Sequence, residues 1–397
     1  MTTLALAVAS AGVCAISLAA LFDRAVGEPP TSRHPVAWFG RLVAPVDRDW
    51  SRPRLVGAIA TVSLALLAAG VAAGAVLAAG AAGAGVGRAV GSIGFGRGVV
   101  VPRTVALAAA TVAAGLVLAV ATSLRMLVDV AREVTAATAS DLAAARRDLR
   151  ALAGRDAATL SPGEVRSAAV ESAAENLADG LVAPLAGFVV PVVAWLLVEP
   201  AAGGGGGNWP PATVPAVPTP AVPLALGAAG AAWVKAVNTC DSMLGYRTKP
   251  VGWAAARLDD ATVYLPARAS AGLLAVAAGD PGAVARARPL ARRPASPNSG
   301  WPMATLAAAL GVRLAKPGHY DLDAGPSLPS VADAERGVAV VERAGWLAIG
   351  LAIALVGLAA AVPGPVDLPT VVVPSPATGT TITPGSQSAT AGVATWS

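Results

Sequence analysis

Apolar residues are gathered into six runs along the chain, and each run is followed by a more polar segment. A helix needs roughly 20 apolar residues to cross a bilayer, and most of these runs approach or reach that length. In lipid a helix satisfies its own backbone hydrogen bonds, so helices are the expected form. The pattern predicts an all-α, polytopic integral membrane protein with about six transmembrane helices, at residues 4–22, 55–85, 105–124, 181–198, 224–237 and 345–362.

Three of the intervening segments are polar and rich in arginine: residues 23–54, 125–180 and 238–343. They contain six, seven and twelve Lys or Arg residues, whereas the two other segments and the C-terminal tail contain three, none and none. Basic residues favour the cytoplasmic side of a membrane. We therefore expect a multi-pass protein of the cell membrane, with the three polar segments in the cytoplasm and both termini outside.

Two stretches differ in composition from the rest. Residues 201–223 are rich in Gly and Pro, which indicates an irregular outer loop. Residues 363–397 are rich in Pro, Thr and Ser and have Asp367 as their only charge, which is typical of a disordered tail. Residues 1–362 are expected to form a single membrane-embedded domain. Its first span is expected to be retained, because no basic segment precedes it as in a signal peptide.

The composition supports a membrane protein. Of 397 residues, 55% are hydrophobic and 13% are charged, and a soluble protein carries about twice that share of charge. The net charge of +5 comes mainly from arginines beside the apolar runs, where they act as topology signals or contact lipid phosphate. No basic patch is interleaved with aromatic residues, so we expect no nucleic-acid partner. The two cysteines, Cys14 and Cys240, form neither a disulfide framework nor a pair of metal ligands.

A row of carboxylates precedes the fourth run. A helix is expected to begin at Ser161, where the sequence Ser-Pro-Gly-Glu supplies a cap, a first-turn proline and a glutamate. Glu171, Glu175 and Asp179 then follow at intervals of four and share one helical face, with Asn176 beside them. Like charges at this spacing repel, and Mg²⁺ bridging to a phosphate would offset the repulsion. The alternative is an ordinary solvated helix face.

The most polar stretch of the chain, residues 238–268, follows the fifth run directly. Charges of both signs at a membrane edge are costly unless they pair or bind a ligand. A helix is expected from Trp253 to Tyr264, ending near Pro266, with Arg257 and Asp260 on one side and Asp259 offset. An internal ion pair between Arg257 and Asp260 is the alternative to a phosphate and metal site. The candidate residues in this stretch are Asn238, Asp241, Ser242, Arg257, Asp259, Asp260, Tyr264 and Arg268.

Two further motifs lie in the polar segments. Ser296-Pro-Asn298-Ser-Gly-Trp301-Pro predicts a turn whose tryptophan either faces a large ligand or packs the loop. In the first segment, Asp23 either ends the first span or belongs to a site, and His34 is more typical of a structural hydrogen-bonding group than of a catalyst. The chain contains no Walker A pattern, GxGxxG after a strand, HExxH or GxSxG.

Together these motifs resemble a known family. The segments DRAVGEPP, HPV, FGR, ESAAENLADGLVAPL, NTCDSMLGYRTKPVGWAAARLDDATVYLPAR and SPNSGWPMATLAAALGVRL are similar, in this order, to the CbiB/CobD family of cobalamin biosynthesis. The resemblance covers about residues 23–346. It departs at Glu28, where the family usually has Asp, and at Cys240, where an apolar residue is more usual. The outer loop and the tail lie outside it.

The resemblance implies an adenosylcobinamide-phosphate synthase, an ATP-dependent amide-forming ligase. It would join a carboxylate of adenosylcobyric acid, a corrinoid, to the amine of (R)-1-amino-2-propanol O-2-phosphate. ATP and Mg²⁺ are the cofactors it implies, and membrane lipid surrounds the protein. A homo-oligomer, or an association with other cobalamin-pathway proteins, is left open.

We assign expected roles from the resemblance and the residues together. Asp259 and Asp260, with Glu175 or Asp241, are expected to hold Mg²⁺ and phosphate, and Arg257 and Arg268 to bind phosphate. The catalytic set is Asp259, Asp260, Asp241 and Glu175, and the metal set is Glu171, Glu175 and Asp260. The substrate-binding set is Asn176, Asp179, Asn238, Ser242, Arg257, Tyr264, Arg268, Ser296, Asn298, Trp301, Arg313, His34 and Asp23.

Two other functions fit parts of the sequence. Charges among the spans would also suit a membrane transporter of an anionic substrate, although the polar residues gather on one face and no clear inverted repeat is present. Asp259-Asp260 alone would suit a phosphotransferase that acts on a lipid.

Overall fold

Long apolar helices form the frame of the protein. The computed structural model describes residues 3–92, 100–153, 157–198 and 219–362, which all belong to one unit, Met1–Gly364. Within these ranges, five helical stretches are long and apolar enough to cross a membrane: Thr3–Ala25, Pro53–Gly91, Pro102–Ala137, Pro162–Val198 and Val331–Ala359. The prediction of an all-α polytopic membrane protein is confirmed.

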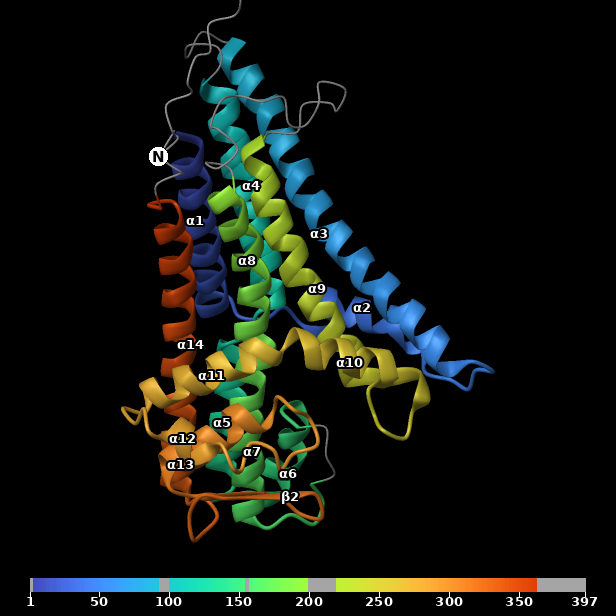
Figure 1. Cartoon of the computed structure of the whole chain (residues 1–397), viewed down its shortest axis with the longest axis vertical. Helices are drawn as coiled ribbons and strands as arrows, with labels where there is room; N and C mark the ends of the chain where they lie inside the picture. Colours follow the sequence, from blue (N-terminus) through green and yellow to red (C-terminus); the bar gives the residue numbers. More distant parts are fainter. Residues whose placement is uncertain (1–2, 93–99, 154–156, 199–218, 363–397) are drawn as a thin grey trace, which may run out of the picture. The chain divides into compact units, whose positions relative to one another are not determined.

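The frame consists of α1 (Thr3–Ala25), α3 (Pro53–Ser92), α4 (Val100–Ala121), α8 (Ala183–Val198), α9 (Val222–Leu244) and α14 (Val331–Ala359). Figure 1 shows these helices running side by side along the long axis, with α3 diverging from the others at its lower end. Helix α9 corresponds to the fifth expected span and packs against α3, α4 and α8. It is longer than residues 224–237 and includes Lys235, Asn238 and Asp241, so its apolar length is shorter than that of its neighbours.

The fourth span begins well before its apolar run. Helix α7 (Pro162–Leu177) starts at Ser161, whose side chain accepts a hydrogen bond from the Glu164 backbone N–H, and the predicted capping box is present. A π-helical turn, η4 (Ala178–Val182), then joins α7 to α8. Pro191 lies inside α8 without ending it. The carboxylates of α7 therefore sit on a rigid extension of a spanning helix.

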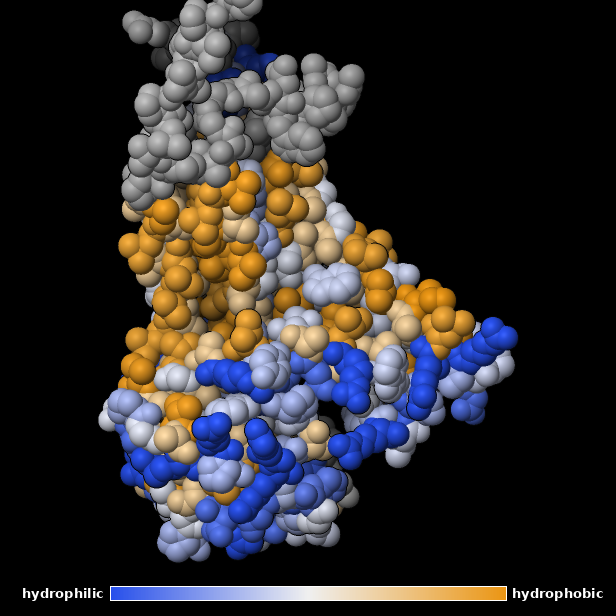
Figure 2. Space-filling model, in the orientation of Figure 1, coloured by the Kyte–Doolittle hydropathy of each residue, from blue (hydrophilic) through white to orange (hydrophobic). Residues whose placement is uncertain are grey.

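Shorter helices are gathered at one end of the frame, where Figure 2 shows hydrophilic residues replacing the hydrophobic surface of the long helices. Helices α10 and α11 run across this end, and α11 packs against α14, α13 and η4 (Figure 1). The elements concerned are η1 (Thr31–Arg33), α2 (Pro35–Val43), η2 (Ala44–Val46), α5 (Arg125–Ala137), α6 (Leu142–Asp148), η3 (Leu149–Ala151), η6 (Pro250–Gly252), α10 (Trp253–Thr262), α11 (Tyr264–Ala277), α12 (Ala283–Ala287) and α13 (Gly300–Leu310). One further short helix, η5 (Thr219–Ala221), precedes α9.

A small antiparallel hairpin lies at the same end and was not expected from the sequence. Strands β1 (Arg313–Lys316) and β2 (Tyr320–Asp323) pair with Arg313 opposite Asp323 and Lys316 opposite Tyr320. The hairpin packs on α7, where the Ser167 hydroxyl accepts a hydrogen bond of 2.8 Å from the Ala315 backbone N–H. Four-residue strands separated by Pro-Gly provide too short an alternation to be recognised in the sequence.

Close helix approach brings the polar residues of different segments together. A Cβ atom on Gly230 of α9 would lie 2.1 Å from the Gly187 carbonyl oxygen of α8, so the two backbones meet where only glycine fits. At the other end of α9, a Cβ atom on Gly252 would lie 1.7 Å from the Leu244 carbonyl oxygen. Glycine at this position lets the chain fold back after α9, and α10 then packs on α9.

Some expectations are corrected or fall outside the described residues. The helix expected from Trp253 to Tyr264 ends at Thr262, and Pro266 lies in the first turn of the next helix, α11. Cys14 is exposed on α1 and Cys240 is buried on α9, and both are free thiols. Most of the expected outer loop, at 199–218, and the expected tail at 363–397 lie outside the described residues.

Candidate functional site

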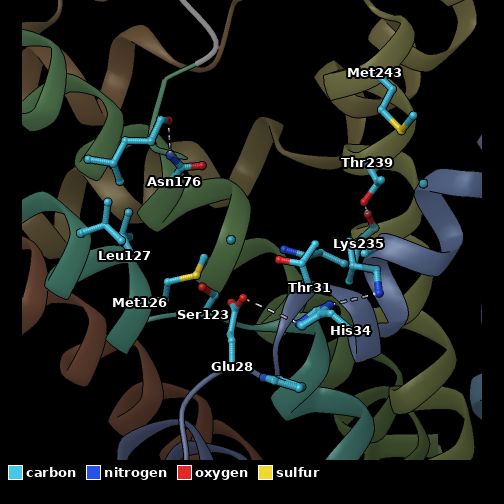
Figure 3. Close-up of a pocket in the computed structure, with 17 residues that line it drawn as sticks. Glu28, Thr31, His34, Ser123, Met126, Leu127, Asn176, Lys235, Thr239 and Met243 are labelled. Carbon is cyan, nitrogen blue, oxygen red and sulfur yellow. Dashed lines mark hydrogen bonds and ion pairs between the residues drawn. The ribbon is translucent and has the colours of Figure 1, made fainter. Parts of the chain in front are cut away.

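A cavity of about 500 Å³ lies at the polar end of the frame, which is within the range of small-molecule sites. Four chain segments meet there: the first polar segment, the start of α5, the α7–η4 junction and α9. Figure 3 shows side chains from all four segments around it. The lining residues are Glu28, Pro29, Thr31, His34, Val36, Ala37, Gly40, Ser123, Met126, Leu127, Val130, Leu152, Asn176, Gly180, Lys235, Thr239 and Met243.

His34 is held in one orientation at the wall of this cavity. It caps α2, and its Nδ1 accepts a hydrogen bond of 3.2 Å from the Val36 backbone N–H. Nδ1 therefore acts as an acceptor, and Nε2 is the ring nitrogen that faces Glu28. That nitrogen lies 3.7 Å from a carboxylate oxygen of Glu28. Both ring nitrogens therefore face protein groups, so His34 orients Glu28 and is not itself poised to take a proton from a substrate.

Lys235 is the cation of the cavity. It lies on α9 and was not among the residues singled out in the sequence. Thr239, one turn later, also lines the cavity and donates a hydrogen bond of 2.7 Å to the Lys235 carbonyl oxygen. Glu28 and Asp179 are the carboxylates that act electrostatically on the Lys235 ammonium.

Four carboxylates form a group behind the cavity, which we call the carboxylate cluster: Glu175, Asp179, Asp241 and Asp259. They come from α7, η4, α9 and α10, and Asp179 interacts electrostatically with the other three and with Lys235. Asn176 and Gly180, the neighbours of Glu175 and Asp179, line the cavity. The cluster and the cavity therefore share the α7–η4 junction, and π-helical turns are frequent at functional sites.

Asp259 is the member of the cluster that lies farthest from the spanning helices. Burial and the neighbouring carboxylates of Asp241, Asp260 and Glu175 raise the pKa of Asp259 to about 7. The Asn238 amide opposes the shift by donating a hydrogen bond of 3.4 Å to Asp259. A carboxyl group with a pKa near neutrality changes its charge easily, which is a common property of catalytic sites.

Asp260 belongs to a neighbouring hydrogen-bonded group that ties α10 to the Ser296–Trp301 turn. Its side chain accepts a bond of 3.3 Å from the Ser296 hydroxyl, and its carbonyl oxygen accepts one of 2.8 Å from the Asn298 amide. Burial raises the pKa of Asp260, while the Ser296 hydrogen bond and the nearby Arg257 oppose the shift. The alternative interaction of Arg257 with Asp260 is therefore present as an electrostatic contact beside the cluster.

Arg268 links this group to two aromatic rings, and together they form what we call the aromatic platform: Tyr264, Arg268 and Trp301. The guanidinium lies 3.4 Å from the centre of the Tyr264 ring and 5.4 Å from that of Trp301. It also donates a hydrogen bond of 3.0 Å to the Asn298 side chain. Ser242, by contrast, is exposed and donates only to the Asn238 carbonyl oxygen of its own helix.

Three of the expected site residues lie elsewhere. Glu171 is fully buried, and its carboxylate accepts hydrogen bonds from the Ser167 hydroxyl at 2.7 Å and the Tyr320 hydroxyl at 2.8 Å. Arg313 pairs with Asp321 across the hairpin, through two of its guanidinium nitrogens. Asp23 caps the start of α5 by accepting a bond of 3.0 Å from the Arg125 backbone N–H. The structure therefore does not place these three residues with the cavity or the cluster.

The expected metal set of Glu171, Glu175 and Asp260 is not assembled, because Glu171 faces the hairpin. Within residues 3–92, 100–153, 157–198 and 219–362, no three His, Cys, Asp or Glu side chains converge to hold a metal ion. Mg²⁺ usually keeps several waters and binds through one or two carboxylates together with phosphate oxygens. The all-oxygen donors of the carboxylate cluster fit such an ion, but not a cage built from protein ligands alone.

The sequence interpretation missed most of the cavity wall. Lys235 is a single charge within an apolar run, which is a recognised signal of a functional position in a membrane protein. Glu28 was noted only as a departure from a family pattern. Thr31, Ser123 and Thr239 are ordinary hydroxyl residues, and only the meeting of four segments shows that they face one cavity.

Comparisons with known proteins agree with the motifs. A family model described as "CobD/Cbib protein" matches residues 16–348. The cobalamin biosynthesis protein CobD of Mycobacterium tuberculosis strain H37Rv is 36% identical over 339 residues, which cover 81% of this chain and 89% of the relative. The CobD protein of Klebsiella pneumoniae is 34% identical over 355 residues, 84% of this chain and 93% of the relative.

A third relative is similar at a lower identity. The probable cobalamin biosynthesis protein CobD of Methanothermobacter thermautotrophicus is 30% identical over 326 residues, 78% of this chain and 86% of the relative. No solved structure matches the chain. The similarity extends over the helical frame, the cavity and the carboxylate cluster.

Proposed function

The chain belongs to the CobD/CbiB family of cobalamin biosynthesis proteins, and on this premise we propose that it is an adenosylcobinamide-phosphate synthase. The proposed reaction forms an amide between a carboxylate of adenosylcobyric acid and the amine of (R)-1-amino-2-propanol O-2-phosphate. ATP is converted to ADP and phosphate, and the oxygen lost from the carboxylate leaves with that phosphate.

One observation carries the proposal: a cavity containing a lysine borders four carboxylates at the polar end of a membrane-embedded frame. An amide-forming reaction driven by ATP requires cations to hold phosphates and carboxylates to hold a metal ion. It also requires a site from which water is largely excluded. The half-buried cluster beside the cavity meets these requirements better than the exposed ion pairs elsewhere on the protein.

We propose that Asp259 and Asp241 hold Mg²⁺ together with phosphate oxygens and water, while Glu175 and Asp179 act on the ion electrostatically from farther away. Bound there, the ion would neutralise the negative charge that develops on the phosphate oxygens. Asn238 orients Asp259 through its hydrogen bond of 3.4 Å. Ser296 and Asn298 hold Asp260 and thereby fix α10 against the turn that carries Trp301.

The corrinoid is assigned to the exposed side of the site. A corrinoid is large and partly apolar, and the aromatic platform offers it flat surfaces fixed by the Arg268 contacts. Arg257 is exposed beside Asp260 and is available to a phosphate group. Arg313, which was expected to bind substrate, is unsuited to that role because Asp321 pairs with it in the hairpin.

The polar end is proposed to face the cytoplasm, where ATP is available. The support is the distribution of Lys and Arg, which places the three arginine-rich segments on one side. A reporter fused to the C-terminus tests this orientation. The reporter should be inactive if it requires the cytoplasm, and cytoplasmic activity would contradict the orientation.

The function is tested with the full-length protein in detergent or nanodiscs. Adenosylcobyric acid, the amine phosphate, ATP and Mg²⁺ together should give the amide, and omission of ATP should abolish it. Absence of product in the complete mixture would contradict the proposal. Flux of an anionic substrate into proteoliposomes without product would support transport instead, and dependence on a lipid substrate would support a lipid phosphotransferase.

A further inference from the structure

The Lys235 ammonium lies in the cavity without an ion-pair partner among the described residues. Glu28 and Asp179 act on it from a longer distance, but neither is within salt-bridge range. An ammonium group at a partly desolvated position is costly unless an anion accompanies it. The cavity around Lys235 is therefore suited to an anionic group supplied by a ligand.

A carboxylate, Glu28, lines the same cavity. Its side chain is 23% exposed, and its neighbour His34 is 9% exposed. Nδ1 of His34 accepts a hydrogen bond from the Val36 backbone N–H, and Nε2 lies 3.7 Å from one Glu28 carboxylate oxygen. Glu28 keeps its capacity to bind a cationic group. Figure 3 shows Glu28, His34 and Lys235 around the same cavity.

The other residues that line the cavity provide two kinds of surface. The hydroxyl side chains of Thr31 and Ser123 provide donors that suit a phosphate, whereas the Thr239 hydroxyl donates to the Lys235 carbonyl oxygen. Met126, Leu127 and Met243 provide an apolar surface for a short carbon chain. Among the residues that the structure describes, the cavity thus combines one cation, one carboxylate, hydroxyl donors and a small apolar area.

We propose that this cavity binds the amine substrate: a small primary amine that carries a phosphate monoester, with the phosphate at Lys235 and the ammonium at Glu28. The inference rests on the proposed function and extends it by assigning the amine to a site separate from the aromatic platform. A ligand with charges of both signs complements both side chains at once. The cavity of about 500 Å³ exceeds the size of such a ligand, which leaves room for the carboxylate-bearing arm of the corrinoid.

A nucleotide phosphate has the same chemistry as a phosphate monoester, so the experiment must separate the two sources. The variant is Lys235→Met, which keeps much of the length of the side chain and removes its charge. We expect the KM for the amine phosphate to rise about 10- to 100-fold, the usual effect of losing a hydrogen bond between charged groups. The KM for ATP should change less than about twofold, which is within ordinary variation.

A second measurement uses the same amine without its phosphate. The wild-type protein should prefer 1-amino-2-propanol O-2-phosphate over 1-amino-2-propanol, and Lys235→Met should lose most of that preference. Glu28→Gln should weaken binding of both amines to a similar extent, while Glu28→Asp should restore it. The ratio of binding between the two amines in each variant shows whether that variant affects recognition of the phosphate or of the amine.

The control variant is Lys316→Met, which removes the same charge from β1, outside the cavity, and should leave every KM unchanged. Lys235→Arg keeps the charge. This variant should fold and bind the amine phosphate if the loss of charge causes the effect of Lys235→Met. Thermal stabilisation of the protein by the amine phosphate, lost in Lys235→Met, provides a readout that needs no activity.

Two results would overturn the inference without affecting the proposed function. A wild-type protein that forms amide, with Lys235→Met retaining its KM for the amine phosphate, would exclude Lys235 from the site. A rise in the KM for ATP alone would assign Lys235 to the nucleotide. If the wild-type protein forms no amide but is stabilised by the amine phosphate through Lys235, the proposed function fails and the binding site stands.

Discussion

Glu171 lies within three turns of Glu175 and Asp179, two members of the carboxylate cluster, on α7 and its extension η4. The surroundings of Glu171 differ from those of the cluster. Glu171 is fully buried, and both Ser167 and Tyr320 donate hydrogen bonds to it, so its charge is satisfied by the protein. In the carboxylate cluster, Asp259 has a single hydrogen bond of 3.4 Å from Asn238 and several carboxylates nearby.

The difference shows that a charged side chain at a membrane edge is not by itself evidence of a site. Glu171 holds the hairpin on α7, and its partners offset its burial. The cluster gathers like charges around Asp179, and among the described residues Lys235 is the cation that acts on Asp179. Such an arrangement costs stability and is expected where a ligand or a metal ion supplies the missing charge.

The largest expected effect is on the cluster. Asp259→Asn removes a carboxylate that we propose as a Mg²⁺ ligand, so the rate of amide formation should fall about 100-fold or more. The folded state should be at least as stable as the wild type, because one repelling charge is gone. Asp323→Asn, an exposed change in β2, is the control and should leave the rate unaltered. A normal rate in Asp259→Asn would remove Asp259 from the mechanism.

The next effect concerns the hairpin. Tyr320→Phe removes the hydroxyl that donates a hydrogen bond to the buried Glu171 carboxylate, so the free energy of unfolding should fall by about 1–3 kcal/mol. The rate of amide formation per folded molecule should change little. Chemical denaturation in detergent measures the first quantity, and Tyr246→Phe, at an exposed ring, is the matched control. If the hairpin variant lost activity without losing stability, Glu171 would belong to the site after all.

The pH dependence of the free energy of unfolding should reveal the raised pKa of Asp259 in the carboxylate cluster. Since the folded-state pKa of Asp259 is raised to about 7, the folded protein holds its proton more tightly than the unfolded chain, whose aspartate titrates near 3.9. The stabilising contribution of Asp259 is therefore complete below about pH 4 and is lost as the pH rises through 7. Thermal unfolding of the wild type and Asp259→Asn across this range should show the two curves diverging, and parallel curves would contradict the raised pKa.

The smallest effect is expected at the aromatic platform. Arg268→Lys keeps the charge but loses the planar stacking on Tyr264 and the contacts to Asn298 and Pro297, so stability should fall by about 1 kcal/mol. The KM for the corrinoid should rise more than that for ATP if the platform binds the corrinoid. Arg288→Lys, an exposed change after α12, provides the baseline. An equal rise for both substrates would argue against a role in corrinoid binding.

Much of the fold could be predicted from the sequence. The apolar runs predicted the five spanning helices, and the Ser161 cap predicted the start of α7, because both signals are local in the chain. The hairpin could not be predicted, since its strands are four residues long and depend on packing against α7. The end of α10 at Thr262 was also missed, because Pro266 is tolerated in the first turn of α11.

The candidate site was predicted unevenly. Asp241, Asp259, Glu175 and Asp179 were recognised as unusual charges, and the structure brings them together. Helical spacing put Glu171 in the same row, but spacing describes one helix and says nothing of what packs on it. Lys235 and Glu28 lie far apart in the sequence and face one cavity because the first polar segment packs on α9 through α2.

The sequence by itself determined that this is a helical membrane protein of the CobD/CbiB family and that its polar chemistry lies in three arginine-rich segments. Those conclusions depend on composition and on motifs that are local in the chain. The tertiary structure alone decided which charges are satisfied and which are not. That outcome depends on distances between segments. The element that packs against a carboxylate decides whether the carboxylate accepts a hydrogen bond from a hydroxyl or lies beside another carboxylate.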